Sequence, residues 1–153
     1  MFKNKQLEFN INGNILEVAD FTWYIDRINM IYVAQSCMHI DMWSIYIETD
    51  NEIDKLYFES DKATEILNNF RHLCNKIRKE NANFKTHGPR CFNFANVKDI
   101  ESSEILVVNM APAHSVRLVF KNGKFKELKE SDGELKSLIE DLNEVQQSSD
   151  LQQ

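Results

Sequence analysis

The sequence has little of the residue types and spacings that identify an enzyme. Only four of its 153 residues are glycine, and Gly13, Gly88, Gly123 and Gly133 lie too far apart for a phosphate-binding loop. It also has no Cys-X-X-Cys pair, no HExxH segment and no GxSxG turn. These absences exclude the common signatures of nucleotide-phosphate loops, zinc proteases and serine hydrolases. We therefore predict a protein that is not an enzyme and carries no cofactor.

Long apolar runs are also missing. None reaches the roughly 18 residues that a membrane-spanning helix needs, and the opening segment MFKNKQLEFN lacks the apolar core of a signal peptide. The three cysteines, Cys37, Cys74 and Cys91, are odd in number and widely spaced, which fits a reducing compartment better than a disulfide framework. We expect a cytoplasmic protein that makes no use of a membrane.

The composition is that of an ordinary globular chain, with 42% hydrophobic and 27% charged residues. The net charge of −6 argues against a general nucleic-acid coat, because such proteins bind by neutralising phosphates with cations. Sixteen asparagines, and 13 lysines against five arginines, suggest an AT-rich genome. We expect a bacterial or phage protein for which nucleic acid is not the main partner.

Alternating apolar residues predict β-strands over much of the chain. Leu7, Phe9 and Ile11 alternate with polar residues, Asn12-Gly13 favours a two-residue turn, and Ile15 begins the return strand. Further strands are predicted near residues 21–25, 31–33, 43–47 and 56–58. The first part of the chain should therefore form antiparallel β-structure.

Helical spacing replaces this alternation after residue 60. Ser60 is a suitable N-cap for a helix at 61–79, whose apolar residues recur on one stripe. The order then begins again, with strands from Phe92 onward, a turn at Asn122-Gly123 and a second amphipathic helix with a stripe from Leu135 to Val145. The sequence thus predicts strands followed by a helix twice.

The two halves can be aligned. The second helical stripe follows the first by 72 residues, and Phe21 and Trp23 match Phe92 and Phe94 at a shift of 71. We predict an α+β fold of antiparallel β-strands with two amphipathic helices, in which a tandem repeat of βββα units competes with chance patterning as the explanation. Residues 1–146 would form one compact domain with half-repeats at 19–79 and 90–146, and the polar residues 147–153 would fray.

One segment concentrates positive charge. Between residues 71 and 90 lie six cations and one acid, Glu80. Clustered cations beside an aromatic ring can hold a phosphate, a nucleotide or an acidic protein surface, although the helix dipole alone also favours cations near a helix C-terminus. The predicted anion- or partner-binding residues are Arg71, Lys76, Arg78, Lys79, Lys85, His87 and Arg90.

Three aromatic residues are candidates for an exposed binding surface. Tyr24 and Tyr46 alternate with the apolar positions of their strands, and Phe84 lies within the basic segment. Large rings at such positions are suited to contact with another protein.

A metal site is a weaker hypothesis. Cys37 and His39 would point to the same side of a strand, as two zinc ligands could. On the predicted helix, however, His72 and Cys74 are about 200° apart, so that Cys74 joins the apolar stripe while His72 faces solvent. We therefore predict no metal site.

Together these patterns favour a non-enzymatic binding or interaction protein that self-associates, as a dimer or other homo-oligomer, through sheet edges. Its second partner would be another protein, such as a host factor blocked by a phage or mobile-element product. The alternative is a nucleotide or single-stranded nucleic-acid binder that uses the basic segment 71–90. Because this segment joins the two halves, an anionic ligand would lie at their junction.

Overall fold

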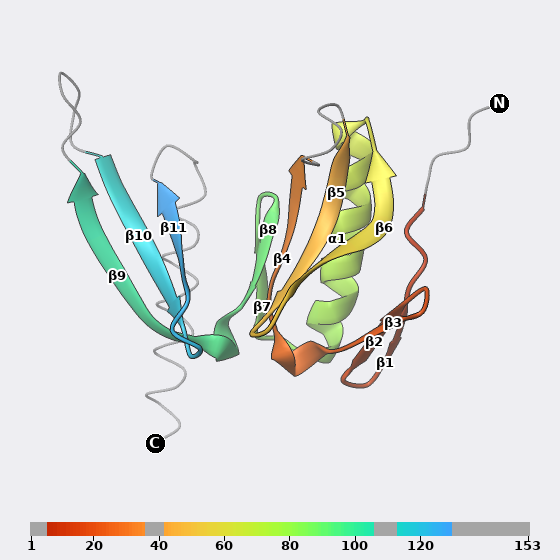
Figure 1. The fold of residues 1–153 in the computed structure, drawn as a ribbon, viewed down its shortest axis with the longest axis horizontal. Coiled ribbons are helices and arrows are strands. Elements are labelled where there is room, and N and C mark those ends of the chain that lie inside the picture. Colours follow the sequence, from red (N-terminus) through yellow and green to blue (C-terminus); the bar gives the residue numbers. More distant parts are fainter. Residues whose placement is uncertain (1–5, 36–41, 106–112, 130–153) are drawn as a thin grey trace. The chain divides into compact units, whose positions relative to one another are not determined.

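The computed structural model describes residues 6–35, 42–105 and 113–129 (Figure 1). Contacts divide the chain into two compact units, Met1–Asn93 and Phe94–Gln153, and each is described by itself. Within the described ranges the protein is α+β, consisting mainly of antiparallel β-strands with one α-helix. The single domain expected over residues 1–146 stays a prediction.

The first unit begins with a small antiparallel sheet. Its strands are β1 (Asn10–Asn12), β2 (Ile15–Val18) and β3 (Phe21–Tyr24). Because Asn12 pairs with Ile15, the first turn consists of Gly13 and Asn14, with Gly13 at a φ of +59°. The turn predicted at Asn12-Gly13 is therefore one residue out, since glycine takes the first turn position and not the second.

A five-stranded antiparallel sheet forms the body of this unit, in the order β6-β5-β4-β8-β7. Its strands are β4 (Ile28–Gln35), β5 (Trp43–Thr49), β6 (Ile53–Ser60), β7 (Phe84–His87) and β8 (Arg90–Asn93). A short 3-10 helix, η1 (Ile25–Arg27), leads into β4. The strands predicted near 21–25, 31–33, 43–47 and 56–58 are confirmed, and β4 lies between two neighbours that are distant from each other in sequence.

Helix α1 (Ala63–Glu80) covers one face of the five-stranded sheet (Figure 1). Its apolar stripe packs on strand residues such as Ile31, Ile45 and Ile47, because alternate residues of a strand share one face. The buried helix residues are Ile66, Phe70, Leu73, Cys74 and Ile77. The helix predicted at 61–79 is confirmed to within two residues at each end.

The start of α1 differs from the predicted one. Lys62 precedes the first helical residue, and its side chain makes no capping hydrogen bond. Ser60 is still the last residue of β6; its hydroxyl accepts a hydrogen bond from the N–H of Lys62 (3.1 Å) and donates one to Glu65 (2.9 Å). Ser60 thus braces the turn into the helix, and its prediction as the N-cap is wrong.

The second unit contains a three-stranded antiparallel sheet in the order β11-β10-β9. Its strands are β9 (Val97–Ile105), β10 (Ala113–Phe120) and β11 (Phe125–Lys129), and a 3-10 helix, η2 (Phe94–Asn96), precedes them. Leu118 and Phe120 are buried. Gly123, at a φ of +87°, lies in the loop between β10 and β11, where the sequence predicts a turn.

The second predicted helix, with its stripe from Leu135 to Val145, and the polar tail at 147–153 lie outside the described residues. The described part of the chain therefore contains one α-helix and not the two that the sequence predicts.

A run of elements in the first unit has counterparts of the same length later in the chain. Strands β2 and β7 each have four residues, and their first residues, Ile15 and Phe84, are 69 positions apart. The same spacing separates β3 from β8, η1 from η2 and the start of β4 from that of β9. The loops between the paired strands also correspond, because Ala19 and Gly88 have positive φ values of +52° and +59°. The shift of 71 aligned from the sequence is two residues too long here.

The strand pairings that follow correspond as well. The second residue of each long strand, Asn29 in β4 and Lys98 in β9, is skipped by the pairing with the next strand, as in a β-bulge. Beyond this irregularity Tyr32 pairs with Tyr46 in the first unit. Glu101, 69 positions after Tyr32, pairs with Arg117 in the second. The two units thus share the register of their longest strand pair.

Candidate functional site

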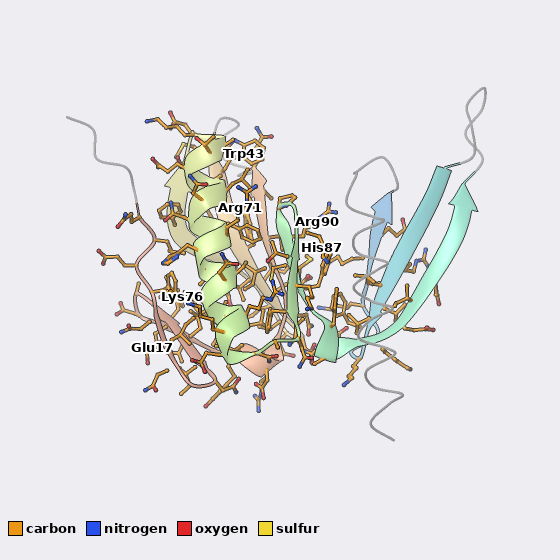
Figure 2. All side chains as sticks on the ribbon, turned by 180° about the vertical axis from the view of Figure 1, so that it is seen from behind. Glu17, Trp43, Arg71, Lys76, His87 and Arg90 are labelled. Carbon is orange, nitrogen blue, oxygen red and sulfur yellow. The ribbon has the colours of Figure 1, made fainter. Side chains whose placement is uncertain are left out.

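The first unit has a groove beside α1, formed where an N-terminal segment runs along the helix (Figure 2). In this segment Leu7 donates its backbone N–H to Oδ1 of Asn69 (2.9 Å). Asn69 in turn donates its side-chain N–H to the carbonyl of Glu65 (2.8 Å). The ring of Phe9 lies against that of His72, with 5.5 Å between the centroids. These contacts hold the segment on the helix.

The groove consists of two hollows that share Leu7 and His72. The hollow nearer the helix N-terminus measures about 470 Å³ and is lined mostly by polar side chains. The hollow nearer the C-terminus measures about 490 Å³. Its other lining residues are Glu8, Phe9, Ile11, Lys76, Lys79 and Glu80. Both volumes lie in the range of small-ligand pockets.

Helix periodicity explains why two of the predicted cations line this groove together. Lys76 and Lys79 follow His72 by four and seven residues, a spacing that places all three on one side of α1. Glu8 and Glu80 line the same hollow. The hollow therefore carries separated positive charges beside the ring of Phe9 and not a continuous positive track.

Two other predicted cations lie on a different side of the same helix. Arg71 and Arg78 are exposed, and at 3.6 residues per turn they lie roughly 100–120° around α1 from His72. Arg78 is on the side of the β7–β8 hairpin, where it acts electrostatically on the thiol of Cys91. Figure 2 shows Arg71 on the helix, apart from the hairpin residues His87 and Arg90.

The remaining predicted cations point away from α1. Thr86 faces the helix, where it hydrogen-bonds with Cys74, so its neighbours Lys85 and His87 lie on the opposite face of the sheet. Arg90 pairs with His87 across the hairpin and shares that face. The seven predicted residues thus form three groups and do not converge on one site. The period of the chain changes from helical to strand-like within the basic segment, which separates them.

The three predicted aromatic residues have different surroundings. Tyr24 is 52% exposed, and the guanidinium of Arg27 lies 5.2 Å from its ring centroid. Tyr46 is half-buried, and its ring stacks on that of Tyr32 with 5.3 Å between centroids. Phe84 is fully buried in the core under α1, so the expectation that it is exposed is wrong. Its strand turns it toward the helix.

The sequence reasoning missed Tyr32, the partner of Tyr46 across β4 and β5. Burial raises the pKa of Tyr32 from its ordinary value of 10.0, and the carboxylate of Glu48 raises it further. Alternation could have indicated the pair, because both tyrosines follow or precede fully buried isoleucines, Ile31 and Ile47. What alternation does not give is the register that stacks them.

The structure also bears on the metal hypothesis. His72 is exposed and Cys74 buried, as expected, whereas Cys37 and His39 lie outside the described residues. Cys74 hydrogen-bonds with Cys91 of β8; burial raises the pKa of the Cys74 thiol, and this bond raises it further. Within the described ranges no cluster of three or more His, Cys, Asp or Glu side chains is suited to hold a metal ion.

No protein-family model, curated protein or solved structure matches this chain. No helix in the described part is both long and apolar enough to cross a membrane. The functional argument therefore depends on the geometry of the two units themselves.

Proposed function

We propose that this chain is a non-enzymatic binding protein that holds a short acidic segment of another protein in the groove beside α1. The observation that carries the proposal is the set of His72, Lys76 and Lys79 in one hollow with the ring of Phe9. Lysine and histidine can bind carboxylates, while the ring and the lysine stems offer apolar surface to the rest of a peptide. Among the three groups of predicted cations, this is the one that lines a hollow.

The charges around the hollow favour a peptide over a nucleic acid. Glu8 and Glu80 line the same hollow as the two lysines, so a regular row of phosphates would meet like charges there. Acidic side chains in a peptide are separated by neutral residues and can match separated cations. The net charge of −6 also opposes phosphate binding.

The test compares two charge reversals on opposite sides of one helix. Lys76→Glu with Lys79→Glu changes the groove, and Arg71→Glu with Arg78→Glu makes the same change in net charge at exposed positions outside it. The probe is a fluorescent polyglutamate peptide, and the readout is anisotropy at low salt. We expect the groove variant to lose roughly tenfold in affinity or more, because two charge contacts become repulsive. The control should stay within roughly twofold.

An oligothymidylate probe is the second arm of this experiment. Binding of the oligonucleotide alone, with the same dependence on Lys76 and Lys79, would replace the acidic peptide with single-stranded nucleic acid as the ligand. Equal losses in both double variants, or no binding of either probe at low salt, would contradict a groove site.

We also propose that the two units are copies of one structural unit, composed of a hairpin, a 3-10 helix, three strands and a helix. The spacing of 69 residues, the matching irregularities at Asn29 and Lys98 and the positive φ of Ala19 and Gly88 support this proposal. The helix of the second copy would be the amphipathic segment at 132–145. Helical backbone chemical shifts for this segment in the full chain are expected, and extended or random-coil shifts would rule the second helix out.

A further inference from the structure

The two hairpins of the proposed repeat have different neighbours. The hairpin β7–β8 extends the sheet of the first unit, because β8 pairs with the outer edge of β4. The corresponding hairpin β2–β3 pairs, among the described strands, with β1 alone. The strand that corresponds to β4 is β9, which is the outer strand of its own sheet (Figure 1). One chain thus presents both halves of an interface that it already contains once.

We propose that β3 of one copy of this chain adds to β9 of another copy, as β8 adds to β4 within the chain, so that copies join head to tail. This inference depends on the repeat and not on the acidic-peptide groove. The joined strands would form a six-stranded antiparallel sheet, with β1-β2-β3 of one copy continuing into β9-β10-β11 of the next. Main-chain hydrogen bonds would supply the affinity, as in other cases of strand addition.

The internal interface predicts the register of the external one. Strands β4 and β8 pair through Met30 with Phe92, Ile31 with Cys91 and Tyr32 with Arg90. Moving these pairs by 69 positions places Asp99 opposite Trp23, Ile100 opposite Thr22 and Glu101 opposite Phe21. Ile100 and Thr22 are therefore the centre of the predicted contact.

The backbone of β9 has groups directed toward this contact. In the internal interface Val33 donates its N–H to the carbonyl of Pro89 (2.9 Å), and Ser102 occupies the position of Val33 in β9. Alternate residues of an antiparallel strand direct their backbone groups to the same side, so Ile100 shares the direction of Ser102. The N–H of Ile100 is bonded to the carboxylate of Asp99 (2.8 Å), an exposed group that an incoming strand can displace.

The backbone of β3 is directed outward at the matching position. Val18 pairs with Phe21 around the two-residue loop, and such a loop closes on a hydrogen-bonded pair. The next residue, Thr22, therefore directs its N–H and carbonyl away from β2. Phe21 and Tyr24, at the two ends of β3, are 45% and 52% exposed. Exposed aromatic side chains on an edge strand favour pairing with another strand.

A second copy is the occupant that the geometry favours, because the chain itself carries a hairpin matched to the β9 edge in length, loop and register. The two edges are different surfaces, so the contact is heterologous and forms either a closed ring or an open chain of copies. A two-fold dimer would instead pair one edge with itself.

Proline substitutions test the two edges separately. Ser102→Pro removes an outward N–H from β9, and Thr22→Pro removes one from β3; edge strands tolerate proline where the N–H faces outward. Circular dichroism checks that each variant folds, and sedimentation velocity over a range of concentrations measures the mass. We expect the unaltered chain to grow in mass with concentration toward a ring or an open chain, and each proline variant alone to remain monomeric.

The decisive measurement is an equimolar mixture of the two proline variants. Each keeps the edge that the other lacks, so the mixture should form a dimer of one copy of each kind and nothing larger. If a proline variant fails to fold, Thr22→Cys and Ile100→Cys replace the pair: mixed and treated with oxidised glutathione, they should form a disulfide between unlike copies, since a hydrogen-bonded pair brings the Cα atoms to about 5.5 Å.

Three results would overturn head-to-tail pairing: a monomeric unaltered chain at high concentration, self-association that survives both prolines, or a cross-link between like copies only. The charge-reversed groove variant, Lys76→Glu with Lys79→Glu, should self-associate normally. Failure of strand addition and failure of the groove are therefore seen in different measurements.

Discussion

One row of cross-strand neighbours has different chemistry in the two units. In the first unit the row contains Tyr32 stacked on Tyr46. The corresponding positions of the second hold Glu101, Arg117 and Glu127, and Arg117 forms an ion pair with Glu127 at 2.6 Å and lies 4.0 Å from Glu101. The same register thus accepts an aromatic pair or a row of charges, because cross-strand neighbours need only complement one another.

The opposite face of the same strands varies much less. Ile31 and Ile47 pair under α1 and are fully buried, and the corresponding pair in the second unit is Ile100 and Leu118. Leu118 is fully buried and Ile100 half-buried. Burial limits these positions to apolar residues, whereas the other face can change its chemistry. Two units can therefore share a backbone plan with almost no identical residues.

The largest expected effect tests the difference between the two buried pairs. Ile31→Ala should lower the free energy of unfolding by about 3 kcal/mol, because it leaves a cavity in the core under α1. Ile100→Ala should cost about 1 kcal/mol, since half of the side chain is already in contact with solvent. Urea unfolding followed by tryptophan fluorescence reports the first unit, which contains both tryptophans, Trp23 and Trp43; circular dichroism reports both units. Equal losses at the two positions would contradict the difference in burial.

A smaller effect compares the two hairpin loops. Gly88→Ala places a Cβ at a φ of +59° and should lower the free energy of unfolding by about 1 kcal/mol. Ala19 already has a Cβ at a φ of +52°, so Ala19→Gly should be neutral or stabilise by up to about 1 kcal/mol. Thermal unfolding measures both. Opposite signs are the expected result; destabilisation by both substitutions would show that the loops are not equivalent.

A pH effect separates the two rows of neighbours. Because burial and Glu48 raise the pKa of Tyr32, the folded chain keeps the phenol proton at a pH where the unfolded chain loses it. Stability should therefore be unaffected below pH 10 and fall as the pH rises above it. Tyr32→Phe should remove this part of the decrease, and Glu48→Gln should reduce it. Urea unfolding at pH 8 and at pH 11 measures the change, and an unaltered pH dependence in Tyr32→Phe would assign it to other groups.

Local pattern predicts the elements of this fold well, since alternation identifies the strands near 43–47 and 56–58, and a 3.6-residue stripe identifies α1. Pairing across long separations is not contained in such patterns. Nothing near Arg90 indicates that β8 joins β4 about 60 residues earlier. The candidate site failed for a related reason. A run of cations spanning 71–90 crosses from helix to hairpin, and neighbours in sequence then lie on opposite faces of the sheet.

The smallest expected effect is at Arg117, at the centre of the charged row. Its side chain is 42% exposed, and its guanidinium also lies 4.3 Å from the ring centroid of Phe125. Arg117→Ala should lower the melting temperature slightly at low salt, and the difference should vanish in 1 M NaCl, where exposed charges are screened beyond roughly 3 Å. Tyr46→Ala, at the corresponding position of the first unit, should lower it equally at both salt concentrations, because stacking on Tyr32 is not screened. A loss in Arg117→Ala that is independent of salt would mean that the guanidinium stabilises its sheet through the Phe125 ring, and the two rows would then be more alike than their charges suggest.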